Sequence, residues 1–316
     1  MINKQKNAYL DLKINWESLL KNDNNLRIRD AASKLGVSEA ELLSTEIGDT
    51  TSYLSIDNYY EFFKNILKLN KVMFLVRNDF VVHEKIITAL SYILKENYIM
   101  SKDGNRLIDV NFNNIKYAFF QKKKHKKIEL KSFQLFDNNG NSIIKIYLKD
   151  DNHNPFDKIA EKYKKKYLYE LQSQDLTLQN NSNYYTFQDI NVFYKQRQTN
   201  SHSHKIAGKN FRSIIDKVSD YKIKIQIILV SKNIIQYHED KLIKIVDYGP
   251  WYNILDKNFN LHILEKKIHH LEIHNLSTSE IDYHLINVLD ENDNTILALS
   301  SSSGYEKQFS NIIKEI

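Results

Sequence analysis

Two histidines in related stretches of the sequence are the first candidates for chemistry in this chain of 316 residues. His83 follows an apolar pair in VMFLVRNDFVVHEK, and His238 takes a similar place in LVSKNIIQYHEDK. A neutral imidazole offers one ring nitrogen to a metal such as iron. The same side chain can instead hydrogen-bond to the backbone where a strand turns. The sequence leaves both interpretations open for each histidine.

Two more groups of histidines lie in the second half of the chain. His202 and His204 in NSHSHK could supply an imidazole or pair with an anionic group, but their polar surroundings favour the end of a loop. His270, Glu272 and His274 would share one face of a strand, because strand side chains alternate. A zinc site needs ligands that converge from more than one element. We therefore expect these three side chains on a solvated strand face.

Several enzyme classes are excluded by residues or motifs that the sequence lacks. The chain has no Cys, so it has no disulfide, thiolate metal site or cysteine nucleophile. It also has no Walker loop, GxGxxG pattern, G-x-S-x-G elbow or zincin HExxH motif. These absences remove the common nucleotide-binding, serine-hydrolase and zinc-protease mechanisms from consideration.

The charge and hydropathy patterns bear on partners and location. The net charge of +6 suggests an acidic partner or ligand, although the basic residues are spread along the chain. The one dense basic run, KKKHKK at 122–127, is expected to be a solvated hairpin tip, so we expect no nucleic-acid partner. No run approaches the roughly 18 apolar residues of a membrane span, and charge interrupts the N-terminal segment where a signal peptide would be apolar. We expect a cytoplasmic protein without a membrane span.

The sequence repeats its own outline. Leu75-Val76 matches Leu229-Val230 at an offset of 154 residues (229 − 75). FDNNGNSII matches LDENDNTIL, where Asp137 and Asp290 differ by 153 residues (290 − 137). Two matching blocks in the same order, at nearly one offset, predict an internal duplication.

The expected elements give the fold class. Helical spacing is found at 7–20, and helices are also expected around 30–43, after Ser55 and at 187–198, whereas the segments from Lys71 alternate like strands joined by short polar turns. Short turns between successive strands predict antiparallel sheets. We therefore predict an α+β fold with two large antiparallel β-sheets, each with packed helices.

The domain boundaries follow from the repeat and from one polar tract. We predict a first repeat at 1–170, a linker at 171–185 and a second repeat at 186–316. The linker carries the polar tract LQSQDLTLQNNSNYY.

Several segments resemble the haem-utilisation, or hemin-degrading factor, family (HemS/ChuS/HmuS-like). They are LRIRDAASKLGVSEAELL (26–43), RNDFVVHEK (77–85), SFQLFDNNGNSIIKIY (132–147), IIQYHEDK (234–241) and GPWYNILDKNFNLHILEKKI (249–268). They occur in the family's order, and the GPW-containing segment is the most specific. The resemblance implies an internally duplicated fold in which each half is a large antiparallel sheet with helices. It therefore agrees with the repeat seen in the sequence itself.

The resemblance also implies a function. Members bind haem in the cytoplasm of bacteria that import it, and either pass the haem on or open its ring to release iron. Haem would thus be ligand or substrate, with an electron-donating reductase or a haem-import ATPase as further partners, and the chain could form a homodimer. Whether the chain is an oxygenase-like, haem-degrading enzyme stays open. The alternatives are a non-catalytic haem carrier or buffer, and a divergent scaffold that has lost haem ligation.

The family's iron ligand is a His on the first helix of the second half, and the matching residue here is Asn191 in DINVFY. An amide binds haem iron poorly, whereas an imidazole nitrogen binds it well. If haem binds, we expect a substitute imidazole, in the order His238, His204 and His83. His238 comes first because it lies on a strand, and a rigid element holds ligand geometry better than a loop does. His204 comes second because it follows the ligand helix, and His83 comes third because it belongs to the other half of the chain.

Charged and pocket positions complete the expected haem site. Arg77 and Arg197 suit haem propionates, because guanidinium and carboxylate groups form charge-assisted hydrogen bonds. Three other positions of the family pocket, an Arg, a Lys and a Tyr, fall near Asp109, Leu276 and Ser300 of this chain.

Overall fold

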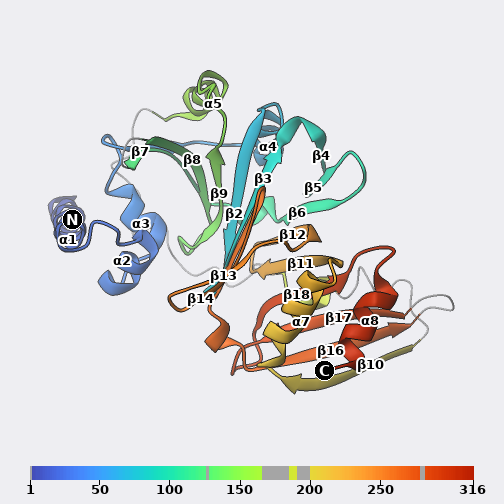
Figure 1. Cartoon of the computed structure of the whole chain (residues 1–316). Helices are drawn as coiled ribbons and strands as arrows, with labels where there is room; N and C mark the ends of the chain where they lie inside the picture. The colour runs from blue at the N-terminus through green and yellow to red at the C-terminus, as the bar shows by residue number, and fades with distance from the viewer. Residues whose placement is uncertain (1, 126–127, 166–184, 191–199, 278–281) are drawn as a thin grey trace. The chain divides into compact units, whose positions relative to one another are not determined.

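The computed structural model describes residues 2–125, 128–165, 185–190, 200–277 and 282–316. Its strands belong to two nine-stranded antiparallel sheets, with helices packed on them (Figure 1). The predicted α+β class with two large antiparallel sheets is confirmed. The chain divides into two compact units, and the division falls inside strand β2 (Lys71–Arg77).

Unit 1 comprises Met1–Met73, Thr88–Leu90 and Asn111–Asn183. Its helices are α1 (Ile2–Asn22), α2 (Ile28–Leu35), α3 (Glu39–Ser44), α4 (Tyr59–Ile66) and α5 (Asn154–Tyr163). Its strands, in spatial order, are β1 (Thr51–Leu54), β7 (Tyr117–His125), β8 (Ile128–Phe136) and β9 (Ser142–Leu148). The basic run at 122–127 thus begins inside β7 rather than at a hairpin tip, and its last two residues lie outside the described residues.

Local sequence signals account for the helix ends of unit 1. Gly36 ends α2 in the left-handed conformation (φ 68°), which glycine adopts without steric cost. The Ser38 side chain accepts a hydrogen bond from the Glu41 N–H at 3.1 Å and caps α3. Trp16 of α1 is 2% exposed and packs on α2 and α3 through a small apolar cluster with Ala31 and Leu42. Burial of this large ring fixes the N-terminal helix.

Unit 2 comprises Phe74–Ile87, Ser91–Val110 and Tyr184–Ile316. The second sheet lies wholly within it. The strands of this sheet, in spatial order, are β10 (Asn200–Ala207), β16 (His270–Ser277), β17 (Asp282–Leu289), β18 (Thr295–Ser301), β11 (Lys224–Ser231), β12 (Ile234–Lys241), β6 (Arg106–Val110), β5 (Tyr98–Ser101) and β4 (Tyr92–Lys95). Four further strands pair in the order β3 (Val81–Thr88), β15 (Phe259–Ile263), β14 (Trp251–Asp256) and β13 (Ile245–Tyr248).

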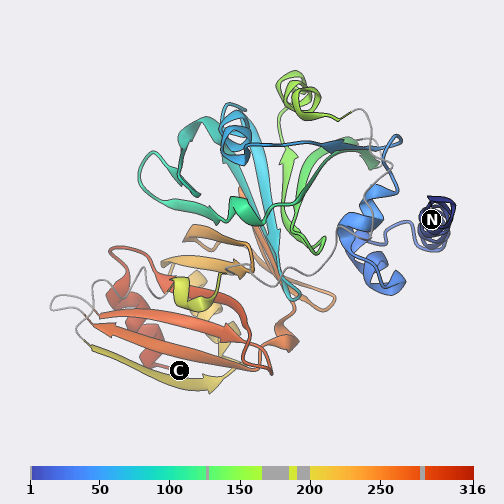
Figure 2. The ribbon, with the colours of Figure 1, turned by 180° about the vertical axis from the view of Figure 1, so that it is seen from behind.

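Helices cover the second sheet on both faces. Helices α7 (Asn210–Asp220) and α8 (Glu306–Lys314) lie on the face nearer the viewer in Figure 1. In Figure 2, seen from behind, a short helical segment at 187–190 lies in front of the same sheet on the opposite face. None of the described helices is both long and apolar enough to cross a membrane.

The internal duplication is visible in two turns. In the turn after β8, Asp137 Oδ1 accepts hydrogen bonds from the N–H groups of Asn139 and Asn141. In the turn after β17, Asp290 Oδ1 accepts the same two bonds, from Asn292 and Asn294. The sequence offset of these blocks therefore reflects a shared structure, and the predicted duplication is confirmed. The predicted limits of the repeats, 1–170 and 186–316, stay a prediction.

The two repeats exchange strands within unit 2. Strand β6, from the first half of the chain, pairs with β12 of the second half, with Asp109 opposite Ile235. Strand β15, from the second half, pairs with β3 of the first half, with Leu261 opposite His83. Each repeat thus contributes a three-stranded segment, β4–β6 or β13–β15, to strands of the other repeat. This exchange brings residues from both halves to one candidate site.

Candidate functional site

One face of the second sheet combines an apolar floor with half-buried aromatic rings. We call it the aromatic face, and it is made by Tyr185, Phe187, Ile190, Ile228, Val230, Ile235, Tyr237, Leu276, Tyr283, Leu285 and Ala298. Three tyrosines are partly buried against the cluster, whereas the aliphatic side chains are buried. This is the face on which the segment 187–190 lies.

A short capping arrangement places that segment on the sheet. The Thr186 backbone N–H and hydroxyl both donate to Asp189 Oδ2, at 2.6 and 3.0 Å. The Gln188 N–H in turn donates to Thr186 Oγ1 at 3.2 Å. These bonds satisfy N–H groups that a helix start leaves without partners. They direct Phe187 (7% exposed) and Ile190 (1% exposed) onto the sheet.

The strand register decides which side chains share the aromatic face. Ile228 is paired with Tyr237, and Val230 with Ile235, so all four lie on this face. Adjacent residues point to opposite faces of a strand. Tyr237 lies on the aromatic face, so its neighbour His238 points away from that face.

His238 and His83 instead meet in the core on the other side of the sheet. His83 is fully buried, His238 is 3% exposed, and their ring centroids are 6.5 Å apart. The Phe259 ring stacks on His238 at 3.5 Å and contacts His83 at 4.8 Å. The structure thus places the first and third candidate ligands among core side chains.

Electrostatics keep both core histidines neutral. Burial, followed by the positive charge of Lys85, lowers the pKa of His83 to about 3. The same two causes hold the pKa of His238 well below its ordinary value. Lys85 Nζ donates to His238 Nδ1 at 2.7 Å, so the proton of this neutral imidazole resides on Nε2.

In the sequence, His83-Glu84 looks equivalent to His238-Glu239. In the structure, the equivalent positions of the two repeats are shifted from that alignment by two residues. Each repeat has a hairpin turn before the strand that carries its histidine. Asn78 N–H bonds to Val81 O in the first turn, and Ser231 is paired with Ile234 in the second, so Asn78 and Ser231 are equivalent. Counted from these turns, His83 corresponds to Gln236, and His238 corresponds to Lys85. The shared HE pair in the sequence therefore does not mark equivalent positions.

The remaining predicted ligands lie in different places. His202 and His204 are exposed on strand β10, not in a loop. His204 is paired with Ile273, and the next residue of β10, Lys205, is paired with Glu272, so His204 lies on the face opposite Glu272. Arg77 ends β2, is half-buried, and its Nε donates to the Asn78 carbonyl at 3.4 Å. Asn191 and Arg197 lie outside the described residues.

The three pocket positions that the family resemblance implies converge on the aromatic face. Leu276 is part of its floor. Ser300 is fully buried and is paired with Leu285 of the same face. Asp109 of the exchanged strand β6 is paired with Ile235. The three positions therefore lie on one face, where this chain carries an acidic, an aliphatic and a hydroxyl side chain.

A polar group closes one edge of the aromatic face. Arg106 Nη1 donates to Asp109 Oδ1 at 2.5 Å, and the Tyr237 hydroxyl donates to Asp109 Oδ2 at 2.6 Å. Burial raises the pKa of the Asp109 carboxyl, and the Tyr237 hydrogen bond and the Arg106 charge oppose that rise. Arg106 also stacks on Tyr98, with its guanidinium carbon 3.4 Å from the ring centroid. Both charges at this edge are therefore compensated locally.

The imidazole of His274 lies on the aromatic face, whereas the sequence interpretation assigned it to a solvated strand face. His274 is paired with Leu285, and its ring lies 5.1 Å from the Phe187 ring. Its Nε2 is 3.3 Å from Glu272 Oε2, and its side chain is only 15% exposed. Alternation along β16 puts His274 and Leu276 on the same side of the strand. This pattern identifies His274 only after the structure has shown that Leu276 belongs to the aromatic face.

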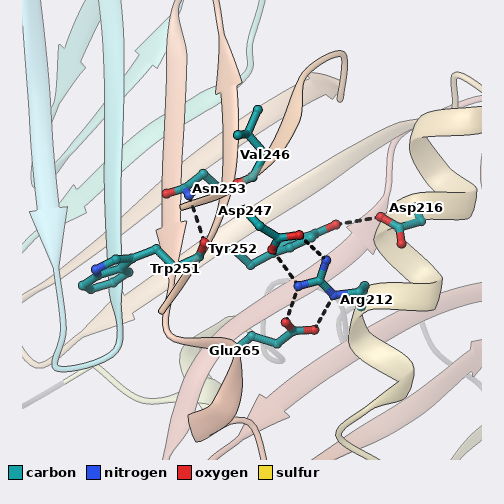
Figure 3. A network of polar contacts seen from close by, with 8 residues as sticks. All are labelled: Arg212, Asp216, Val246, Asp247, Trp251, Tyr252, Asn253 and Glu265. Carbon is teal, nitrogen blue, oxygen red and sulfur yellow. Dashed lines mark hydrogen bonds and ion pairs between the residues drawn. The ribbon is translucent and has the colours of Figure 1, made fainter. Parts of the chain in front are cut away.

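A second polar network lies on the other side of the sheet and joins α7 to strands β13 and β14 (Figure 3). Arg212 of α7 donates to both Asp247 oxygens, at 3.0 and 2.8 Å, and also pairs with Glu265. The Tyr252 ring lies 4.3 Å beneath the guanidinium, and its hydroxyl donates to Asp216 at 2.9 Å. These partners occupy the Arg212 guanidinium, so the network serves to hold elements together.

Among the described residues, no group of three or more histidine, aspartate or glutamate side chains is arranged to hold a metal ion.

Comparisons with known proteins identify related chains. The sequence matches the haemin-degrading HemS.ChuX domain over residues 36–163 and again over 193–312. The fold is similar to the heme-degrading enzyme ChuS of Escherichia coli O157:H7, with a TM-score of 0.83 at 16% identity, covering 98% of this chain and 99% of that one. It is also similar to holo-PhuS, a heme-binding protein from Pseudomonas aeruginosa, with a TM-score of 0.79 at 16% identity, covering 96% and 98%. No curated protein matches the sequence.

Proposed function

The chain belongs to the haemin-degrading HemS/ChuX domain family, and from this we propose that it binds haem and takes part in haem utilisation. The observation that carries the proposal is the aromatic face, because it supplies the surface that a porphyrin needs. A flat apolar ring suits an aliphatic floor edged by half-buried tyrosines. An iron atom suits the imidazole of His274 on the same face.

The polar edge of the face fits haem less well. Propionates prefer cationic partners, but Arg106 is already paired with Asp109 and stacked on Tyr98. The propionates would thus find little uncompensated positive charge at this edge. We propose an affinity that depends mainly on apolar contact and iron ligation, with a small contribution from propionate pairing.

We propose that haem is either transferred onward or opened to release iron. The chemistry of ring opening belongs to the haem iron and O₂, whereas the protein supplies binding, orientation and exclusion of water. An electron-donating reductase would support ring opening, and a haem-import ATPase would deliver haem to the chain. We also propose a cytoplasmic location and leave a homodimer as a further proposal.

A non-catalytic haem carrier is the second candidate. One observation favours it: the residue that matches the family's iron ligand is Asn191. Weak or altered ligation suits a carrier that must release its cargo, whereas ring opening needs iron held in one geometry.

Two measurements separate these functions. Titration of the purified chain with hemin should give a saturable Soret band at one haem per chain, and a linear, non-saturating response would contradict haem binding. Addition of ascorbate in air, with catalase present, should then bleach the Soret band if the chain opens the ring. A Soret band that persists, but moves to apomyoglobin on mixing, identifies the carrier.

A further inference from the structure

The position of His274 differs from that of four other histidines of unit 2. His83 and His238 lie in the core, and His204 projects from the opposite face. His284 lies next to Leu285 on β17 and also points to the opposite face, where its Nδ1 lies 2.7 Å from Asn275 Oδ1. His274 alone among these contacts the ring of Phe187.

His270 shares the face of His274 but lies farther along β16. Four residues of strand separate the two, which corresponds to about 13 Å. His270 is also within 3.1 Å of Asp293, at the end of the strand remote from Phe187. The segment 187–190 therefore has one imidazole beside it.

The carboxylate of Glu272 lies within ion-pair distance of the His274 ring. One ring nitrogen, Nε2, is 3.3 Å from Glu272 Oε2, and the two side chains are 15% and 26% exposed. A metal-ligating histidine almost always donates its other N–H to a carboxylate or carbonyl, which fixes the ring and raises its basicity. Glu272 and His274, two residues apart on one strand face, form that kind of pair.

A buried polar atom also lies beside this pair. Asn287 is 5% exposed and is paired with Glu272 across β16 and β17, so it lies on the same face. Its Oδ1 is buried and makes no hydrogen bond within the described part of the chain. An amide oxygen accepts hydrogen bonds, so an ordered water can satisfy it, whereas the ring and the carboxylates of haem have no donor for it.

We propose that His274 is the axial ligand of haem iron in this chain, with Glu272 as the residue that positions its ring. The imidazole would replace the one that the family carries at the position of residue 191. This inference rests on the proposed haem function and assigns the iron ligand within it.

The test is a set of hemin titrations monitored by absorption and electron paramagnetic resonance. His274→Ala should lose the imidazole-ligated signature of the wild-type complex and bind hemin more weakly. His204→Ala is the matched control, because it removes an exposed imidazole from the opposite face of the neighbouring strand. The control should keep the wild-type spectrum and affinity.

Two further variants exclude a purely structural role. His274→Gly should regain the ligated spectrum when free imidazole is added, because the ligand site is then open to it. Glu272→Gln should keep ligation but weaken hemin binding by about 10-fold and raise the reduction potential, since a neutral partner makes the imidazole less basic. Circular dichroism of each variant verifies that the chain is folded.

The outcomes are distinct. A wild-type chain that shows no saturable hemin binding overturns the proposed function. A wild-type chain that binds hemin, while folded His274→Ala gives an identical spectrum, overturns the ligand assignment and leaves the proposed function standing. A His274→Gly variant that binds hemin without a ligated signature and ignores imidazole also contradicts the assignment.

Discussion

At the residue scale, the charged side chains at the edge of the aromatic face are paired with one another. Asp109 accepts hydrogen bonds from Arg106 and Tyr237, so the guanidinium is compensated before any anionic ligand arrives. Burial makes this compensation necessary, because an ionised carboxyl in an apolar setting is costly without partners. The affinity of the face for an anion is thereby kept low.

Removal of that acid should strengthen haem binding. Asp109→Asn leaves a hydrogen-bonding side chain in place but removes the negative charge beside Arg106. We expect hemin affinity to rise by about 10-fold, equivalent to ~1.4 kcal/mol, and the gain to shrink with added salt. Asp247→Asn, which affects the Arg212 network on the other side of the sheet, is the control and should leave affinity unchanged. An affinity that falls in Asp109→Asn would show that the carboxylate itself contacts haem.

The ligand position offers a second residue-scale prediction. Asn191→His should tighten hemin binding, because a nitrogen ligand is added where the family carries one. With His274 also present, the complex should become six-coordinate and low-spin, which absorption and paramagnetic resonance detect. Asn191→Gln is the matched control, since it changes size without adding an imidazole. An unchanged affinity and spectrum in Asn191→His would place haem away from residue 191.

The buried histidines predict a pH dependence of stability. The pKa of His83 is about 3 in the folded chain against 6.5 ordinarily, so the unfolded chain binds the extra proton between these values. The stability is therefore complete above pH 6.5 and is lost as pH falls toward 3, at up to about 1.4 kcal/mol per pH unit for each such histidine. His83→Gln should make the decline shallower, as measured by urea unfolding at pH 7.5 and pH 5. Equal slopes in the two proteins would mean that other groups cause it.

At the element scale, the exchanged strands explain how one face receives residues from both repeats. Asp109 reaches Tyr237 only because β6 pairs with β12. The sequence does not reveal this exchange, because its strand pattern fixes which side chains face the core but not which strand becomes the neighbour. The helix caps and turns were predictable, since Ser38, Gly36 and the Asp137 turn act through residues close in sequence.

A glycine in one of the repeated turns gives the element-scale prediction. Gly140 has φ 73°, and a Cβ there would lie 2.2 Å from Ser38 Oγ, the cap of α3. Gly140→Ala should therefore lower the free energy of unfolding by about 2–4 kcal/mol, combining left-handed strain with overpacking. Gly304→Ala is the control: φ is 83° there but no atom lies within 4 Å, so the loss should be about 1–2 kcal/mol. Equal losses in urea unfolding would contradict the contact with Ser38.

The equivalent turn of the second repeat shows what this contact demands. Asp293 holds the position that matches Gly140 and has φ 61°, so a residue with a side chain is accommodated in this turn. Its carboxylate pairs with Lys205 and His270 instead of meeting a helix cap. The two repeats thus share a turn but differ in what packs against it.

At the scale of the whole molecule, the duplicated fold has been kept at 16% identity to ChuS and PhuS. The duplication and the family could be predicted because both depend on blocks of local sequence, such as the paired Asp137 and Asp290 turns. The ligand that we propose could not be predicted, because the sequence alone does not show that His274 lies on the aromatic face whereas His238 points away from it; the strand register decides this. The chemistry of a site depends on the face of the sheet to which each side chain points, and a register shift of one residue moves the side chain to the other face.

The most direct test of this account is hydrogen–deuterium exchange of the full chain with and without one equivalent of hemin. We predict that hemin slows exchange in peptides covering 185–190, β12, β16 and β17, which form the aromatic face, and leaves α7 and α8 on the opposite face unchanged. Protection confined to other peptides, with the aromatic face exchanging as in the free chain, would contradict the claim that haem binds there.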